Sequence, residues 1–400
     1  MQERKGPLAG LKVVELAHIM AGPVCGLMLA DMGAEVVKVE KLPGGDDSRR
    51  MVPPTIEGES AAFMMMNRNK RAIALNLKSA EGKEVLRRLL RTADVLVENY
   101  RRGTLEKLGF SWEVLQGLNP RLVYCEISGF GRSGPLADQG GFDLIAQGMS
   151  GLMSITGEGP GRPPVKVGAP VTDTTAGLLA AMGVLAAVVE RQGSGRGQKV
   201  DTSLFEAGIV HTYWQSAIRF ATGVSPGPMG SAHPLNAPYQ AFPTADGWIN
   251  IGAANQANWL RLLDALEAPE LRDDPRFADN PGRMRHLDAL VEILSTIFRR
   301  RSTAEWLAVM EQAGIPAGPV LSIAEMHEHP HTQARGMVVE VEHSRAGPTR
   351  TLGLPVKFSR TPGAVLTGAP VLGEHTREIL ADCGFTPEEA ERLVAAGAVA

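Results

Sequence analysis

Strand-like and helix-like segments alternate along the first third of the chain, and this order restricts the fold more than any other feature. Runs rich in Val, Leu and Ile, which are typical of strands, lie at residues 11–17, 34–40, 71–77, 94–100 and 121–127. Amphipathic helical patterns separate most of these runs. Because a helical crossover joins neighbouring strands in parallel, we expect an α/β fold with a parallel sheet covered by helices on both faces.

The second half of the chain has a different pattern, and 400 residues exceed the usual size of one hydrophobic core. A Pro- and Gly-rich stretch follows residue 222, and a hairpin pattern around Asp246 and Gly247 leads into helical patterns at 258–268 and 288–314. We therefore predict a large domain that begins with 1–203, a linker at 204–229, a smaller α+β domain at 230–322, and a linker with return to the large domain at 323–400.

Charge and cysteine content argue against several classes of protein. The formal net charge is -3, so no basic field would attract nucleic acid or anionic lipid. Cys25, Cys125 and Cys383 lie far apart without a CxxC pair, so we expect neither a disulfide framework nor a zinc site. The N-terminal residues show no signal-peptide pattern, and the apolar stretch 176–189 is too short to span a bilayer. We expect a cytoplasmic protein that is not bound to a membrane.

A glycine motif raises the possibility of dinucleotide binding. Gly129, Gly131 and Gly134 match GxGxxG after a predicted strand. However, Pro135 and a polar run follow where the fingerprint requires a helix, and no strand that ends in an acid lies about 20 residues on. The first strand–helix–strand unit ends suitably at Glu40 but lacks the three glycines. We therefore do not expect a nicotinamide cofactor.

Two further patterns also favour ordinary structural roles. The Gly-rich stretch at 193–198 is not a phosphate-binding loop, because no Lys-Ser or Lys-Thr pair follows its last glycine at the required offset. His327, His329 and His331 alternate, but Pro330 interrupts any helix and no second group of ligands lies near them in sequence. We predict a helix-to-strand turn for the first pattern and a surface loop, not a metal site, for the second.

Asp173 is the most informative single residue. It lies in VTDTTAG, just before a helical pattern of small apolar residues that begins at Thr175, and spacing alone favours a role as the helix N-cap. The same position would also keep a carboxylate ionised and leave backbone amides nearby for an oxyanion. An ionised and rigidly held aspartate can attack a thioester, so a nucleophilic role stands beside the capping role.

A set of motifs resembles one known family over nearly the whole chain. The motifs are GLKVVEL, AGP, GGDDSR, NRNKRAIALNLK, DVLVENYRRGTLEKLGF, NPRLVYCEISGFGRSGP, GFDLIAQGMSG, VTDTTAG, RGQKVD and LGEHTREIL. Together they resemble the class III coenzyme A transferases of the CaiB/BaiF type, which include formyl-CoA transferase and dicarboxylate CoA-transferases. This resemblance implies a Rossmann-like large domain built from both chain ends, an inserted smaller domain, and an interlocked homodimer.

The resemblance also implies roles for individual residues. The family's catalytic aspartate falls on Asp173. Coenzyme A would bind near His18, Met20, Lys41, Leu75, Lys78, Asn99, Tyr100, Lys107 and Leu108. The substrate pocket or a lid over it would contain Arg49, Phe142, Asp143, Gly230, Ser231, Ala232 and His233. Of these, Arg49 and His233 are the candidates for binding the far carboxylate of a dicarboxylic acceptor.

Departures from related enzymes narrow the expected reaction. The α-methylacyl-CoA racemases have a titratable histidine where this chain has Phe142, so transfer is preferred to racemisation. Formyl-CoA transferase has a glutamine in place of Met20 and a run of glycines in place of 230–234, which disfavours oxalate as acceptor. We expect CoA transfer from succinyl-CoA or a similar donor to a small dicarboxylic acid, without a metal. The alternatives are an acyl-CoA racemase or isomerase, and a CoA-binding protein in which Asp173 only caps its helix.

Overall fold

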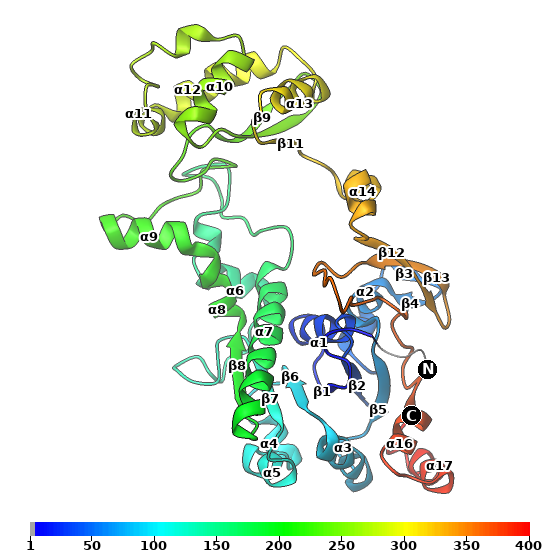
Figure 1. The fold of residues 1–400 in the computed structure, drawn as a ribbon. Coiled ribbons are helices and arrows are strands. Elements are labelled where there is room, and N and C mark those ends of the chain that lie inside the picture. The colour runs from blue at the N-terminus through cyan, green and yellow to red at the C-terminus, as the bar shows by residue number, and fades with distance from the viewer. Residues whose placement is uncertain (1–4) are drawn as a thin grey trace. The chain divides into compact units, whose positions relative to one another are not determined.

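The computed structural model describes residues 5–400 and divides them into two units taken from alternating parts of the chain (Figure 1). The first unit contains residues 5–151, Val167–His211 and Pro330–Ala400. The second unit contains Leu152–Lys166 and Thr212–His329. This division differs from the predicted one, because residues 152–166 join the second unit and the predicted linker 204–229 contains two helices.

A six-stranded parallel sheet forms the centre of the first unit, which confirms the α/β prediction. Its strands are β1 (Lys12–Glu15), β2 (Glu35–Lys41), β5 (Arg71–Leu75), β6 (Val95–Glu98), β7 (Val123–Ser128) and β8 (Lys199–Ser203). Their order in the sheet is β5-β2-β1-β6-β7-β8. The chain therefore winds outward from β1 to one edge and then from β6 to the other, which makes the β1–β6 boundary a topological switch point.

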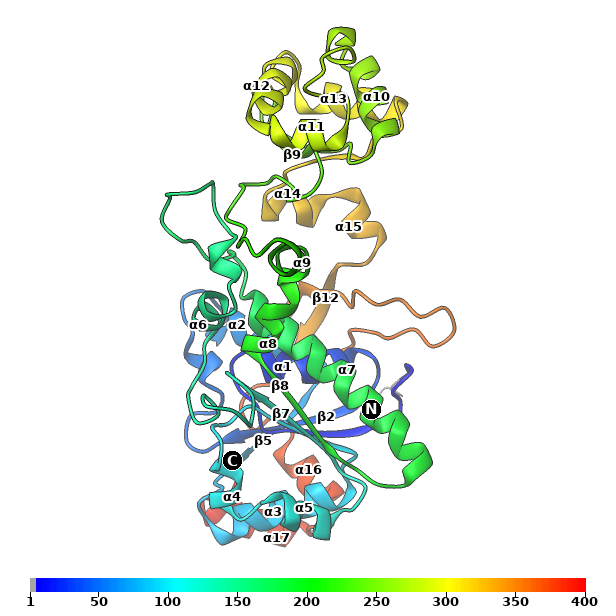
Figure 2. The ribbon, with the colours of Figure 1, turned by 90° about the vertical axis from the view of Figure 1, so that its left-hand side faces the viewer.

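Helices cover both faces of this sheet (Figure 2). One face packs against α1 (Ala21–Asp31) and α7 (Val171–Ser194). The other face packs against α3 (Ala80–Thr92), α4 (Thr104–Leu108), α5 (Trp112–Leu118), α16 (Thr376–Asp382) and α17 (Pro387–Ala395). Side chains of successive strand residues pack alternately into the cores on the two faces of the sheet. Val13 packs under α1 and α7, and Val14 packs under α3. Burial on both faces explains the continuous apolar runs in the sequence.

Small residues bring α7 close to its neighbours. A Cβ atom at Gly177 would lie 2.6 Å from the carbonyl oxygen of Ala21 and 2.8 Å from the Cβ of Val24. A Cβ atom at Gly183 would lie 2.7 Å from a methyl group of Val200. Within residues 5–400, α7 is the one helix long and apolar enough to cross a membrane, but its buried residues, including Ala180, pack on the sheet.

The remaining elements of the first unit are short. They are β3 (Thr55–Ile56), β4 (Glu59–Ser60), α2 (Ala61–Asn67), α6 (Asp143–Met149), α8 (Leu204–Ile209), α15 (Pro330–Ala334), β12 (Val338–His343) and β13 (Gly347–Leu352). Strands β12 and β13 form an antiparallel hairpin. The C-terminal segment thus returns to the unit that contains the N-terminus.

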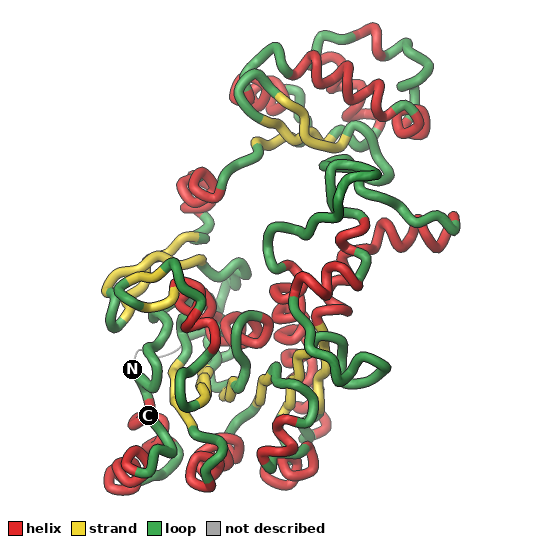
Figure 3. Tube along the Cα trace, turned by 180° about the vertical axis from the view of Figure 1, so that it is seen from behind, coloured by secondary structure: helices red, strands yellow, loops and turns green. Residues whose placement is uncertain are grey.

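The second unit has its own small sheet and its own core (Figure 3). The antiparallel sheet has the order β11-β10-β9, and the turn between β9 and β10 confirms the predicted hairpin at Asp246 and Gly247. The core contains Phe242, Trp259 and Trp306. The elements are α9 (Tyr213–Thr222), β9 (Tyr239–Pro243), β10 (Trp248–Gly252), α10 (Gln256–Ala265), α11 (Asn280–Arg285), α12 (Leu287–Phe298), α13 (Thr303–Gln312), β11 (Ala317–Pro319) and α14 (Ile323–Glu328). Short 3-10 turns in the whole chain lie at Asp47–Arg50, Leu152–Ser154, Val210–Thr212 and Pro269–Leu271.

Local capping sets helix boundaries that the sequence pattern does not show. Residues 104–118 form two helices, because Gly109 adopts a left-handed φ of 91° and Ser111 caps α5. The long pattern at 288–314 likewise breaks at Ser302, which forms a capping box with Glu305. The surface loop predicted for His327, His329 and His331 is wrong, because His327 belongs to α14, Pro330 begins α15 and His331 lies within it, which leaves only His329 between the two helices.

Candidate active site

A cleft of about 330 Å³ opens where the strand order reverses. It is lined by the residues that follow β1, from His18 to Ala21, and by those that follow β6, from Asn99 to Arg102. The loop after β7 and Asp173 of α7 complete its walls, and all of these residues belong to the first unit. Ligands of open parallel sheets bind at this position, outside the carboxyl ends of the strands.

The loop after β1 is held in one conformation by two side chains. The amide of Asn99 accepts from the backbone N–H of His18 at 2.9 Å and donates to the carbonyl of His18 at 2.8 Å. Ile19 has a left-handed φ of 66°, which is unfavourable for a branched residue. Its backbone N–H donates to Asp46 Oδ1 at 3.0 Å. Asp46 therefore stabilises a strained turn in the wall of the cleft.

Asp46 belongs to a buried network of four charges beneath this loop. Lys38 contacts Asp46 at 2.8 Å and Glu15 at 2.9 Å, and Lys70 contacts Glu15 at 2.8 Å. Burial opposes ionisation of Asp46, but the charge of Lys38 outweighs it and holds the pKa of this carboxyl well below its ordinary value. A Cβ atom at Gly26 would lie 1.8 Å from Glu15 Oε2, so the network requires glycine there. Two cations balance two carboxylates, and the network supports the cleft without adding net charge.

The loop after β7 closes on itself. A Cβ atom at Gly129 would lie 2.6 Å from the Cα of Gly141, so the two backbones meet directly. Arg132 fixes the same loop to the sheet by donating to the carbonyl of Tyr100 at 3.0 Å and by pairing with Glu98 and Glu126. The glycine motif therefore serves close backbone packing.

Asp173 does not cap α7, so the capping prediction is wrong. The helix begins at Val171, which places Asp173 in its first turn, and within residues 5–400 no group donates a hydrogen bond to its carboxylate. The cap comes from Asp143, whose Oδ1 accepts from Thr172 N at 3.0 Å and from Thr172 Oγ1 at 2.8 Å. The amide of Gln147 donates to the other oxygen of Asp143 at 2.8 Å.

The environment of Asp173 raises the pKa of its carboxyl to about 6, through burial first and the charge of Asp143 second. This direction is opposite to the lowering expected from the helix N-terminus alone. The ionised form still predominates at neutral pH. The amide of Thr172 bonds to Asp143 and that of Thr174 to the carbonyl of Pro170, so these two expected oxyanion donors are already engaged. The carboxylate of Asp173 lines the cleft, and no residue in the described part of the chain bonds to it.

Comparison with known proteins shows the family of the chain. The family model for CoA-transferase family III matches residues 8–376. The chain belongs to this family. It is 41% identical to the succinate–glutarate CoA-transferase of Agrobacterium fabrum over 96% of this chain and 97% of that protein, and 36% identical to the succinyl-CoA:glutarate CoA-transferase of Mus musculus over 98% and 90%. A CaiB/BaiF family structure from Brucella suis is 39% identical, with a TM-score of 0.84 over 95% of this chain and 100% of that chain. The predicted resemblance is confirmed.

As a member of this family the protein is a CoA-transferase, with coenzyme A as the group it carries. Within residues 5–400 no group of three or more His, Cys, Asp or Glu side chains is arranged to hold a metal ion. The cleft contains six of the residues that the family resemblance assigned, namely His18, Met20, Asn99, Tyr100, Phe142 and Asp173. Burial lowers the pKa of His18, so this imidazole is neutral at pH 7.

Five other predicted CoA contacts of the transferase lie outside the cleft lining. Lys41 ends β2 and pairs with Asp47 at 2.6 Å, Lys78 follows β5, and Lys107 and Leu108 belong to α4. Leu75 is fully buried in the core between the sheet and α3, so its side chain is not available to a ligand. The roles of Lys41, Lys78, Lys107 and Leu108 stay predictions.

Arg49 is not free to bind an acceptor of the transferase. Its guanidinium donates to both oxygens of Glu40 at 2.7 and 2.8 Å and lies 3.6 Å from the ring centre of Phe63. The sequence did not reveal this pairing, because Glu40 lies inside β2 and meets Arg49 only in the folded unit. The structure therefore does not bring Arg49 to the cleft.

The predicted lid residues lie in the second unit of the transferase. Gly230, Ser231, Ala232 and His233 belong to the segment between α9 and β9. His233 stacks on Tyr239 with ring centres 5.1 Å apart, and its Nδ1 accepts from Leu235 N at 3.1 Å. Burial lowers the pKa of His233. A role for these residues over the cleft stays a prediction.

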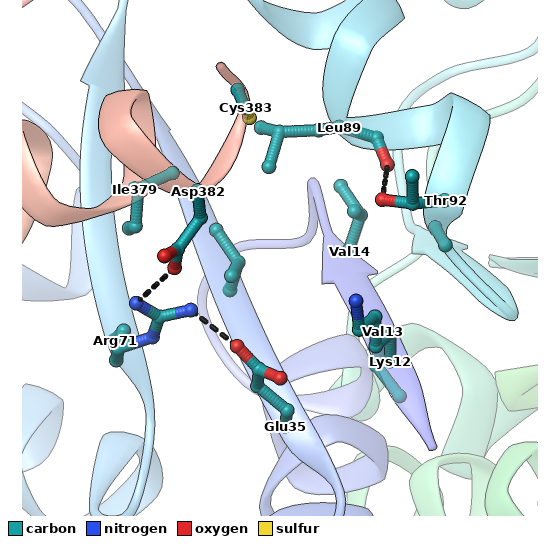
Figure 4. Close-up of a pocket in the computed structure, with 12 residues that line it drawn as sticks. Lys12, Val13, Val14, Glu35, Arg71, Leu89, Thr92, Ile379, Asp382 and Cys383 are labelled. Carbon is teal, nitrogen blue, oxygen red and sulfur yellow. Dashed lines mark hydrogen bonds and ion pairs between the residues drawn. The ribbon is translucent and has the colours of Figure 1, made fainter. Parts of the chain in front are cut away.

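A second cavity of about 340 Å³ lies at the other end of the strands of the same sheet, where they begin (Figure 4). Its polar wall is formed by the first residues of three strands, Lys12, Glu35 and Arg71, together with Asp382 and Cys383 at the end of α16. Arg71 pairs with both Glu35 and Asp382. Burial raises the pKa of the Cys383 thiol to about 11, so it is protonated at neutral pH. This cavity offers no ready nucleophile for acyl transfer.

Proposed function

We propose that the enzyme moves CoA from succinyl-CoA to glutarate or a dicarboxylate of similar size, with Asp173 as nucleophile. The names of the relatives support the substrates. The observation that carries the nucleophilic role is the partly buried Asp173 carboxylate, which lines the cleft with no bonded partner within residues 5–400 and has a pKa of about 6. A carboxylate of this kind keeps its electron pairs available for attack.

The first half-reaction transfers CoA to the enzyme. An oxygen of Asp173 attacks the thioester carbonyl carbon, the carbon–sulfur bond breaks, and the CoA thiolate leaves a mixed anhydride. The thiolate then attacks the carbonyl carbon of Asp173 and releases succinate, which carries away one aspartate oxygen. The product is an aspartyl-CoA thioester, and free CoA does not need to leave the cleft.

The second half-reaction repeats these steps with the acceptor. A glutarate oxygen attacks the aspartyl thioester, the thiolate leaves, and a new mixed anhydride forms. Attack of the thiolate on the glutaryl carbon then gives glutaryl-CoA and restores Asp173, which keeps one oxygen from glutarate. Anhydrides and thioesters hydrolyse, so this chemistry requires water to be excluded while they exist.

We also propose that the enzyme is a cytoplasmic homodimer. The side of α7 away from the sheet exposes Leu178, Met182 and Val189, and α9 of the second unit exposes Trp214 and Phe220. Apolar surface on two long elements supports association with another copy of the chain. Light scattering should give twice the chain mass of 42.7 kDa. A single-chain mass at micromolar concentration would reject the dimer.

Free thiols at Cys25 and Cys125 support the proposed cytoplasmic location, because the cytoplasm is a reducing compartment.

Oxygen labelling tests the proposed reaction. The enzyme is incubated with succinyl-CoA and with glutarate that carries ¹⁸O in its carboxyl groups. Mass spectrometry then measures the masses of the products and of the peptide containing Asp173. We expect glutaryl-CoA to form and ¹⁸O to appear in Asp173 and in the released succinate. Direct attack of glutarate on succinyl-CoA would leave Asp173 unlabelled. Exchange of α-protons without any transfer would support a racemase or isomerase instead.

A further inference from the structure

We propose that Arg101 is the anion anchor of the cleft, a residue that binds a carboxylate or phosphate group of a substrate while Asp173 reacts. This inference rests on the proposed function and adds to it a specificity-determining residue. Arg101 follows β6 at the switch point and lines the same cleft as Asp173. It was not among the residues that the sequence pointed to, because an arginine next to another arginine resembles an ordinary exposed loop.

The other arginines of the cleft are already engaged. Arg132 bonds to the carbonyl of Tyr100 and pairs with Glu98 and Glu126. Arg102 lies 3.5 Å from a carboxylate oxygen of Asp138. Arg101, in contrast, has no carboxylate or carbonyl partner for its guanidinium within residues 5–400. It is the cleft arginine that remains available to an incoming anion.

The neighbouring loop makes room for this guanidinium. A Cβ atom at Gly140 would lie 3.4 Å from Arg101 Nη2, 3.7 Å from its Cζ and 3.8 Å from its Nε. The guanidinium therefore lies against the backbone at Gly140, where a larger side chain would displace it. Because the close contact between Gly129 and Gly141 fixes this loop, the backbone that supports Arg101 is itself held in place.

The charges around the cleft separate the anion-binding role of Arg101 from the nucleophilic role of Asp173. Asp47 has its own cations in Lys41 and Arg50, so it does not compete for Arg101. The pKa of Asp173 is raised by burial and by Asp143, and no cation contributes an opposing effect. Arg101 thus does not neutralise the nucleophile. It can bind a second negative group while the Asp173 carboxylate stays reactive.

Both substrates supply such a group. Glutarate has a second carboxylate that stays charged when the first one reacts, and CoA carries phosphates. Arginine forms charge-assisted, two-pronged hydrogen bonds with either group. The shared chemistry is an anionic oxygen pair, and the two sources can be separated by comparing glutarate with butyrate, which lacks only the distal carboxylate.

The test measures kcat/KM of Arg101→Gln with succinyl-CoA and each acceptor. A loss of about 10- to 100-fold is expected, the range for one charge-assisted hydrogen-bonded contact. If glutarate turnover falls and butyrate turnover does not, the distal carboxylate is the ligand. If both fall together and Arg101→Gln also weakens the binding of acetyl-CoA, which carries the phosphates but no distal carboxylate, the phosphates are the ligand. Unchanged values with both acceptors would overturn the proposal, and Arg102→Gln, whose side chain is already paired, should lose less.

Two further variants separate binding from folding. Gly140→Leu should displace the guanidinium and reproduce the defect of Arg101→Gln, and Gly140→Ala, whose Cβ would lie 3.4 Å from Arg101 Nη2, should lose less. Arg101→Lys should restore part of the loss. If the wild type forms no glutaryl-CoA, the proposed function is wrong, and the role of Arg101 is tested separately. Calorimetric titration of wild type and Arg101→Gln with CoA then decides the phosphate role, and equal affinities would overturn it.

Discussion

Two cavities of nearly equal size lie at opposite ends of the strands of one sheet, and they differ in how their charges are paired. The cavity at the start of the strands holds Arg71 between Glu35 and Asp382, beside a thiol with a pKa of about 11. The cleft at the carboxyl ends of the strands holds Asp173, whose carboxylate has no bonded partner among residues 5–400 and has a pKa of about 6. Cavity volume is therefore a poor guide to chemistry, and the unpaired ionised group distinguishes the two sites.

The largest effect should come from Asp173→Asn. The amide keeps the size of the side chain but is a much weaker nucleophile, so transfer should fall on the order of 10³-fold or more. Calorimetry should show that CoA still binds. The matched variant in the other cavity is Asp382→Asn, which should leave transfer nearly unchanged. Equal losses in the two variants would remove the distinction between the cavities.

Asp46→Asn should give the next largest effect, on stability. The variant leaves the buried Lys38 with one carboxylate fewer, and loss of one partner from a buried ion pair typically costs about 3 to 5 kcal/mol. Chemical denaturation measures this change in the free energy of unfolding. A variant of unchanged stability would show that the network beneath the cleft is not needed to hold the strained turn at Ile19.

Asp143→Asn should change the pH dependence of the reaction. In the wild type, kcat/KM should rise with pH through about 6, as the Asp173 carboxyl loses its proton. Removal of the neighbouring negative charge lowers the pKa of Asp173, so this acidic limb should move to lower pH, with less than about a 10-fold change in the maximal rate. An acidic limb that stays at the same pH would mean that another group controls it.

Cys383→Ala should give the smallest effect. The thiol is protonated at neutral pH and lies where the strands begin, at the other end of the strands from Asp173. Steady-state transfer should therefore match the wild type. Loss of a half-buried side chain should cost about 1 kcal/mol or less in the free energy of unfolding. A clear loss of activity would give the second cavity a role that its paired charges do not indicate.

The sheet and the candidate residue Asp173 could be found from sequence because their signals are local. The apolar runs of β1, β2 and β6 record burial on both faces, and the motif around Asp173 is contiguous. The charge pairs could not be predicted, because Asp46 meets Lys38, and Arg132 meets Glu98, only after distant segments fold together. The misassigned cap has the same origin, since Asp143 reaches the start of α7 from another helix.

The mass of the enzyme after mixing with succinyl-CoA and no acceptor tests the nucleophilic role of Asp173 most directly. We expect a covalent adduct with the mass of CoA less one water on the peptide that contains Asp173, cleaved by hydroxylamine and discharged by glutarate. Steady turnover without any adduct at Asp173, or with the adduct on a different residue, would contradict it.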